Sequence, residues 1–183
     1  MQALATAYKS YRFRSRLEAR WAFFLDQLGV VWEYEPVAYD LGDVRYLPDF
    51  WLPEFKVWVE IKGEIRDDQA GLRMIAQCRQ LAIQDKRPVI LCFRDPFDPI
   101  CAVFTEQGMY PESRWTTCPT CGGLALGVRD GTFSLVWCPR KHESVPLDAA
   151  SLSMARRSLY DAAVAARQRQ FGIANDVQQG TLF

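Results

Sequence analysis

Residues 45–64 read RYLPDFWLPEFKVWVEIKGE. Two runs rich in strand-forming residues, approximately 46–52 and 57–62, lie on either side of residues 53–56, which begin with a proline. A four-residue turn at this point would make the two runs neighbours in an antiparallel pair. The sequence therefore predicts a β-hairpin in which the residues that flank the turn are partners.

Three charged residues fall on one face of this hairpin. In the predicted register Asp49 lies opposite Glu60, with Cβ atoms about 5 Å apart. Lys62 follows Glu60 by two residues and therefore projects from the same face. The opposite face is apolar throughout, and its members are Phe50, Leu52, Val57, Val59 and Ile61. One register thus explains both an apolar face and a polar cluster.

The paired carboxylates indicate a metal site, because two such groups repel each other unless a positive charge lies between them. Mg²⁺ (or Mn²⁺) is the natural ion, since it prefers oxygen ligands. Asp49, Glu60 and the backbone carbonyl of Ile61 are the predicted ligands. The metal would polarise a phosphate oxygen and activate a bound water, while Lys62 would stabilise charge on the phosphate. The alternative is a surface hairpin with a cross-strand ion pair.

A helix is predicted upstream of the hairpin, because apolar residues recur there at helical spacing. These residues are Leu17, Trp21, Phe24, Leu25 and Leu28. Ser15 and Glu18 fit a capping box at its start, and Gly29 fits a stop at its end.

An amphipathic helix over 67–85 and strands at 88–93 and 100–105 follow the hairpin. The apolar side of that helix carries Leu72, Ile75, Ala76, Ala82 and Ile83. Residues 30–41, VVWEYEPVAYDL, contain further strand-forming residues and a proline break before the hairpin. The order helix, three strands, helix, strand then predicts an α/β sandwich over residues 1–110. Three cysteines in apolar surroundings, Cys78, Cys92 and Cys101, are predicted to be small buried residues.

Charge is distributed unevenly, although the net charge is zero. Residues 1–29 contain five basic and two acidic side chains, whereas residues 30–69 contain ten acidic and four basic ones. A basic segment beside an acidic cluster suits a protein that contacts phosphates and holds a cation. The predicted DNA contacts in the basic segment are Arg12, Arg14, Arg16 and Arg20.

A second candidate metal site lies in residues 111–145. Cys118 and Cys121 are followed by a predicted hairpin around Asp130-Gly131, and then by Cys138 and His142, the only histidine. Two ligand pairs separated by a hairpin have the spacing of a structural Zn²⁺ site in a zinc-ribbon-like module. The alternative, three reduced cysteines in a small β segment, would leave that segment almost without a core.

The C-terminal part is predicted to contain a helix within 146–171 and a flexible polar tail over 172–183. Gln179, Leu182 and Phe183 resemble the Q-x-x-L-F peptide by which bacterial replication and repair proteins dock on the sliding clamp. Leu-Phe would fill an apolar groove of the clamp while glutamine makes polar contacts. The alternative is that these residues fold back onto the protein's own surface.

The spacing of the charged residues resembles a known nuclease motif. Pro48-Asp49, with Glu60-Ile61-Lys62 beginning eleven positions after Asp49, is similar to the PD-(D/E)XK motif of the restriction-endonuclease-like superfamily. Residues 10–105 are most similar to the end-cleaving nuclease subunit of some transposases, and related phage and repair nucleases share the pattern. The resemblance implies a restriction-endonuclease-like α/β sandwich, here with a zinc-binding β module and a C-terminal helix. It also implies metal-dependent hydrolysis of DNA phosphodiester bonds in repair, recombination, replication or mobile-element processing.

The resemblance further implies that Glu18 joins Asp49, Glu60 and Lys62 at the catalytic centre, although its capping role explains it equally well. Gln77, or Gln80, matches a glutamine with which some members contact DNA; a solvated polar face is the alternative for both. Two other functions remain open: a non-catalytic adaptor that binds DNA or protein, and a transposase-like subunit that needs a partner. The oligomeric state, and RNA as a substrate, are also open.

No apolar run approaches the roughly 20 residues that span a bilayer. The first residues lack the apolar stretch of a secretory signal. We therefore expect a cytoplasmic protein without a membrane partner.

Overall fold

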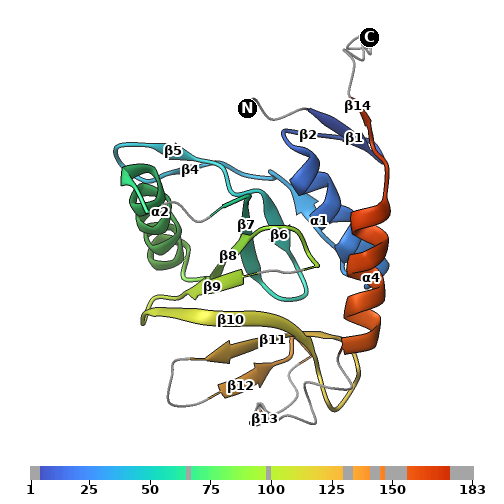
Figure 1. Ribbon diagram of the computed structural model, residues 1–183. Coiled ribbons are helices and arrows are strands. Elements are labelled where there is room, and N and C mark those ends of the chain that lie inside the picture. Colours follow the sequence, from blue (N-terminus) through green and yellow to red (C-terminus); the bar gives the residue numbers. More distant parts are fainter. Residues whose placement is uncertain are drawn as a thin grey trace, which may run out of the picture.

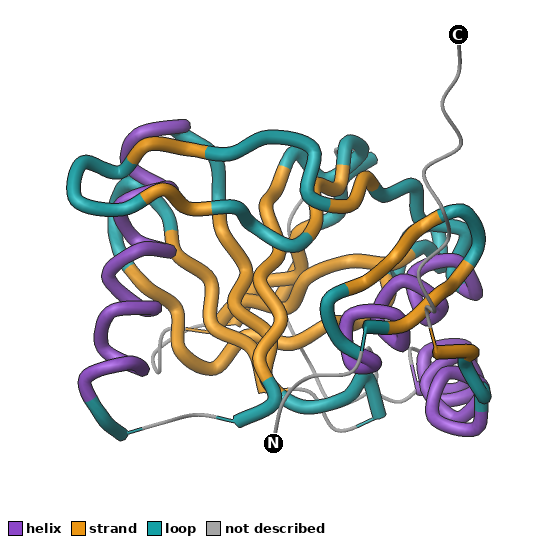
Figure 2. Tube along the Cα trace, turned by 90° about the horizontal axis from the view of Figure 1, so that it is seen from above, coloured by secondary structure: helices purple, strands orange, loops and turns teal. Residues whose placement is uncertain are grey.

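The computed structural model describes residues 5–64, 67–97, 100–129, 134–140, 145–146 and 156–173. Within these residues the fold is mixed α/β, with one large mixed sheet between helices (Figure 1). Helix α2 (Gln69–Asp85) covers one side of the sheet, and α1 (Arg16–Gln27) and α4 (Arg156–Gln168) lie on the other (Figure 2). None of the described helices is both long and apolar enough to cross a membrane.

The large sheet has nine strands. In spatial order they are β13 (Val145–Pro146), β12 (Ser134–Trp137), β11 (Leu124–Arg129), β10 (Met109–Thr117), β9 (Ile100–Phe104), β8 (Val89–Phe93), β7 (Val57–Lys62), β6 (Phe50–Leu52) and β3 (Glu33–Tyr34). Among the strands that the structure describes, only β7 and β8 pair in parallel, because α2 forms the crossover between them. Two small sheets join β1 (Thr6–Tyr8) with β2 (Tyr11–Phe13) and β14 (Gly172–Ile173), and β4 (Tyr39–Asp40) with β5 (Arg45–Tyr46).

The predicted hairpin register is confirmed. Leu52 pairs with Val57 and Phe50 with Val59, and the whole predicted apolar face is buried. One predicted strand differs, however. Residues 46–52 are divided into the end of β5 and all of β6, because Pro48 has no N–H to donate to a strand partner.

Helix α1 begins and ends as the sequence predicts. The Ser15 side chain accepts a hydrogen bond from the Glu18 N–H, at 3.1 Å. At the other end Gly29 has φ +66°, a conformation that suits glycine. The Gly29 N–H donates to Asp26 and the Val30 N–H to Leu25, which together form a Schellman motif.

The sheet separates two apolar cores. One core joins α1 and α4 to the apolar face of the hairpin, and includes Trp21, Phe50 and Val59. The other lies under α2, and includes Trp58 and Leu81. Cys78, Cys92 and Cys101 are buried, as predicted.

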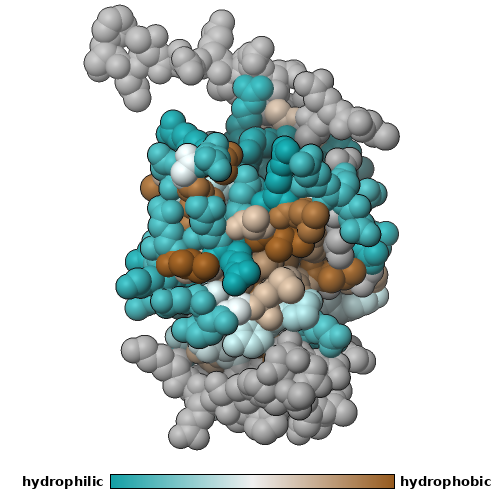
Figure 3. All heavy atoms as spheres, turned by 90° about the vertical axis from the view of Figure 1, so that its left-hand side faces the viewer, coloured by the Kyte–Doolittle hydropathy of each residue, from teal (hydrophilic) through white to brown (hydrophobic). Residues whose placement is uncertain are grey.

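The predicted apolar side of α2 is only partly buried. Of its predicted members Ala82 is buried, and the helix also buries Gly71, Cys78 and Leu81. Leu72 and Ile83 are exposed by 66% and 47%. Figure 3 views this side of the molecule and shows apolar patches scattered among polar residues.

The C-terminal part continues the same sheet. Strand β10 crosses the predicted boundary at residue 110 and pairs with both β9 and β11. Helix α4 buries Ala162, Ala163 and Ala166, while residues 146–155 of the predicted helix lie almost wholly outside the described ranges. Gly172 and Ile173, which the sequence assigned to the tail, pair with β1.

Candidate functional site

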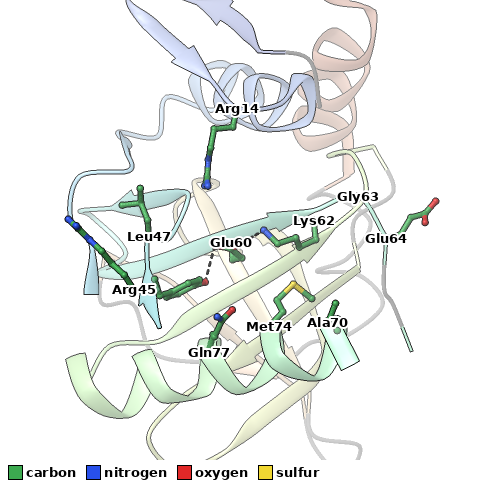
Figure 4. A pocket seen from close by; sticks show the side chains of 12 residues that line it. Arg14, Arg45, Leu47, Glu60, Lys62, Gly63, Glu64, Ala70, Met74 and Gln77 are labelled. Carbon is green, nitrogen blue, oxygen red and sulfur yellow. Dashed lines mark hydrogen bonds and ion pairs between the residues drawn. The ribbon is translucent and has the colours of Figure 1, made fainter. Parts of the chain in front are cut away.

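An open pocket of about 910 Å³ lies where the end of β7 meets α2 and the β4–β5 hairpin. Figure 4 shows Glu60 and Lys62 on one wall, Met74 and Gln77 rising from α2, and Arg14 and Arg45 opposite them. The remaining lining residues are Tyr46, Leu47, Gly63, Glu64, Ala70 and Gly71. Glu60 and Lys62 of the predicted polar cluster therefore line a pocket.

Asp49 is 1% exposed, directly precedes β6 and is not among the residues that line the pocket. Its Oδ2 accepts a hydrogen bond of 2.7 Å from the Ile61 N–H, which ties it to β7. Its Oδ1 accepts one of 2.8 Å from Arg14 Nη2. Burial, followed by the charge of Glu60, raises the pKa of Asp49 well above its ordinary value.

Glu60 is 3% exposed and faces the pocket. Its Oε2 accepts a hydrogen bond of 2.9 Å from the Tyr46 hydroxyl, and its Oε1 forms an ion pair with Lys62. The same Lys62 ammonium also donates to the Ile61 carbonyl, at 3.3 Å. Two of the predicted metal ligands therefore contact one cationic group.

Glu18 reaches the region from α1 and is 7% exposed. Its Oε1 accepts from Ser15 Oγ at 2.7 Å, and its Oε2 accepts from the Tyr34 hydroxyl at 2.6 Å. The Arg14 N–H also donates to Oε2, at 3.1 Å. Because the Arg14 side chain contacts Asp49, this one residue links Glu18 to the hairpin. The capping role of Glu18 and its place beside the cluster coexist.

The network of side chains around Asp49 and Glu60 contains more carboxylates than cationic groups. Arg14 Nε also forms an ion pair with Glu35, at 2.5 Å, so the network has four carboxylates, from Glu18, Glu35, Asp49 and Glu60. Only two cationic side chains, Arg14 and Lys62, pair with them in these contacts. The formal excess of two negative charges equals the charge of one divalent cation. Rim residues Arg45 and Glu64 carry opposite charges and leave this balance unchanged.

Sequence reasoning missed Tyr34, Glu35 and Tyr46. Tyr34 and Tyr46 each donate to a carboxylate, and Glu35 binds Arg14 from a left-handed backbone conformation with φ +46°. Such a conformation is uncommon outside glycine. Their positions depend on how β3 and β5 pack beside the hairpin, which local periodicity does not reveal. The Glu35-Pro36 break was the one available signal.

The predicted DNA contacts are only partly brought together. Arg14 and Gln77 line the pocket. Arg12 and Arg16 are exposed and Arg20 is half-buried, and none of these three lines the pocket. Gln80 does not face it either, because its side chain donates to the Leu41 carbonyl and anchors the β4–β5 hairpin on α2.

Cys118, Cys121 and Cys138 form a separate cluster that can hold a metal ion. Their sulfur atoms lie within 4.8 Å of one another, and no other such group of three or more acidic, cysteine or histidine side chains occurs among the described residues. The turn is tight, since Gly122 donates to the Cys118 carbonyl and Cys118 to that of Gly123, both at 2.8 Å. Three of the four predicted zinc ligands are thus brought together.

The remaining site predictions fall outside the described residues. They concern the fourth zinc ligand and the clamp-binding peptide, namely His142, Gln179, Leu182 and Phe183. No protein-family model matches the chain, and searches of curated proteins and of solved structures also found no match.

The charge balance predicts how Asp49 affects stability. Its pKa is raised in the folded protein, so folding becomes less favourable as pH rises above the ordinary value of 3.8. Asp49→Asn removes this cost without changing the size of the side chain. We expect a higher melting temperature for metal-free protein at neutral pH, by about 2–4 °C for each kcal/mol gained, and no gain below the ordinary pKa.

Thermal unfolding followed by circular dichroism at several pH values measures this difference. Asp43→Asn, at an exposed position on the β4–β5 hairpin, is the matched control and should leave the melting temperature unchanged. A lower melting temperature for Asp49→Asn at neutral pH would contradict the assigned charge imbalance.

Proposed function

We propose that this protein is a metal-dependent DNA endonuclease. The observation that carries the proposal is a network with more carboxylates than paired cationic side chains, in which Glu18, Asp49 and Glu60 are buried and which opens on a pocket beside a lysine. Asp49, Glu60 and Lys62 follow one another along the chain in the order of the PD-(D/E)XK motif. Helices flank the mixed sheet on both sides. A restriction-endonuclease-like fold is part of this proposal.

The donors fit Mg²⁺ or Mn²⁺. Asp49 and Glu60 offer carboxylate oxygens, and Ile61 offers a carbonyl oxygen that Lys62 now contacts. Hard oxygen donors on neighbouring strand residues suit a small divalent cation. When bound, the metal would supply Lewis acidity toward a phosphate oxygen and a more acidic water.

The protein's own residues would orient the substrate and stabilise the negative charge that develops on its phosphate. Lys62, once released from Glu60, would place its ammonium against the developing charge on the scissile phosphate. Its pKa is raised, because the charges of Glu60 and Asp49 outweigh the effect of burial, so the group stays protonated. Tyr46 would hold Glu60, and Arg14 would hold Asp49 in the metal-binding orientation.

DNA is the proposed substrate because the pocket is open and its rim carries guanidinium groups. Arg45 is exposed and the Arg14 side chain is 55% exposed, and both line the pocket. Cationic groups at an open rim suit an extended polyanion. Gln77, on the α2 wall, can reach a base or sugar.

We also propose that the cysteine cluster holds a structural Zn²⁺. Cysteine thiolates are usual ligands of Zn²⁺, and His142 would complete a closed tetrahedral set. Cys118 and Cys138 are each 3% exposed and Cys121 is half-buried, so solvent has limited access to the cluster. This protection favours a structural role over a catalytic one.

A non-catalytic adaptor is the second candidate. It is favoured by the ion pairs of Lys62 with Glu60 and of Arg14 with Asp49, which partly satisfy the site without a metal. An adaptor would bind DNA and metal yet leave every substrate intact. A transposase-like subunit would cleave only in the presence of its partner.

Cleavage assays distinguish these functions. Incubation with plasmid, forked and single-stranded DNA in Mg²⁺ or Mn²⁺ should give nicked or cut products. We expect Asp49→Ala, Glu60→Ala and Lys62→Ala each to lower the rate by about 100-fold or more, because each removes a metal ligand or a charge-stabilising group. A parallel set of RNA substrates tests the choice of DNA.

Glu54→Ala is the matched control, since Glu54 is an exposed acid on the turn of the same hairpin. It should cleave at the wild-type rate. Cleavage that persists in Asp49→Ala and Lys62→Ala would refute the proposed catalytic centre. Metal-dependent stabilisation without cleavage of any substrate would instead support the adaptor.

Metal analysis tests the zinc proposal. We expect one Zn²⁺ for each wild-type chain, and loss of that ion in Cys118→Ser with a melting temperature lower by about 10 °C or more. Cys92→Ala alters an equally buried cysteine outside the cluster and should retain zinc. Full zinc content in Cys118→Ser would exclude this residue as a ligand.

A further inference from the structure

A small hollow of about 380 Å³ lies between the loop that follows β8 and helix α4. We call β7 the catalytic strand, because it carries Glu60 and Lys62. It is lined by Arg94, Asp95, Phe97 and Arg167. In Figure 1 the chain leaves the end of β8 and turns toward α4. No role in the proposed metal chemistry uses this hollow.

Two exposed aromatic rings and a guanidinium meet at the hollow. Phe97 and Tyr160 are exposed by 38% and 56%, and their ring centroids are 5.5 Å apart. The Arg167 guanidinium lies 5.0 Å from the centre of the Phe97 ring. Neither aromatic residue belongs to a buried core cluster, so apolar burial does not account for their pairing.

The loop is held firmly beside the catalytic strand. The Arg94 N–H donates to the Lys62 carbonyl at 2.9 Å, and the Arg94 carbonyl accepts from the Trp21 indole at 3.0 Å. Asp95 closes the loop further by accepting from the Phe97 N–H, at 3.0 Å. Arg94 has φ +65°, a strained conformation that these contacts must maintain.

These contacts place the aromatic pair close to the proposed cleavage centre. Phe97 lies three positions after Arg94, so their Cα atoms are at most about 11 Å apart. Arg94 is itself bonded to Lys62. A single-stranded arm that runs from the scissile phosphate past the end of β7 could therefore reach the rings, if its bases were free of a duplex partner.

We propose that Phe97, Tyr160 and Arg167 bind an unpaired nucleotide that flanks the scissile phosphate. Exposed rings stack on bases regardless of their identity, and a nearby guanidinium adds a phosphate contact or a stacking surface. The Arg167 ion pair with Asp95 measures 4.0 Å, and the Arg167 side chain is 59% exposed, so substrate can replace the pair at little cost. The inference rests on the proposed nuclease function and names its substrate class: DNA with a single-stranded arm at the cut.

Fluorescence anisotropy with the inactive Asp49→Asn protein tests this inference. The probes are a thymidine oligonucleotide, a blunt duplex and a fork that contains the same duplex. Tyr160→Ala and Phe97→Ala should weaken binding of the single strand and of the fork by about 5- to 100-fold, the range expected for lost base stacking. Binding of the blunt duplex should change by less than about 2-fold.

Two variants control for nonspecific effects. Tyr160→Phe keeps the ring and should bind all three probes like its parent. Leu72→Ala removes an equally prominent apolar side chain from α2, away from the hollow, and should also have no effect. Equal loss of single-strand and duplex binding, or no loss, in Tyr160→Ala would overturn the inference.

The two proposals can fail separately. If wild-type protein cleaves forks while Tyr160→Ala binds and cleaves them equally well, the stacking site is wrong and the nuclease stands. If wild-type protein cleaves nothing while Tyr160→Ala loses single-strand binding selectively, the stacking site stands and catalysis is wrong.

Discussion

The pairing of Leu52 with Val57 across the β6–β7 turn determines where the charges of the site lie. Because side chains alternate along a strand, this register buries one apolar face and directs Glu60 and Lys62 away from it. A shift of one residue would exchange the two faces and place the acids in the core. The same register brings Asp49 within hydrogen-bonding distance of the Ile61 N–H. Packing of the core and assembly of the site therefore depend on one constraint.

Burial of several carboxylates is costly and needs positive charge nearby. Here Arg14 and Lys62 supply only part of it, and burial, followed by the charge of Glu60, raises the pKa of Asp49. The two basic residues differ in kind: Arg14 comes from outside the hairpin and binds two acids, whereas Lys62 comes from the same strand as Glu60. A divalent cation would complete the balance and free the lysine for substrate. Charge compensation thus connects the stability of the fold to the proposed chemistry.

Local patterns predicted the features that depend on neighbouring residues. The hairpin, the Ser15 cap and the Gly29 stop involve contacts within a few positions, and the structure has all three. Features that depend on distant packing were not predictable in this way. The apolar spacing of α2 gave no sign that Leu72 would be exposed, and nothing near Tyr46 indicated its bond to Glu60. The cysteine spacing correctly predicted that Cys118, Cys121 and Cys138 lie together, because two of them share a tight turn and the third follows β12, which pairs with β11.

A crystal structure grown with Mn²⁺, with anomalous scattering used to locate the ion, tests the central claim most directly. We expect a manganese peak about 2.1 Å from oxygens of Asp49, Glu60 and the Ile61 carbonyl. We also expect the Lys62 ammonium to have moved away from Glu60. A map without a peak at these oxygens, in which Lys62 still contacts Glu60, would contradict both expectations.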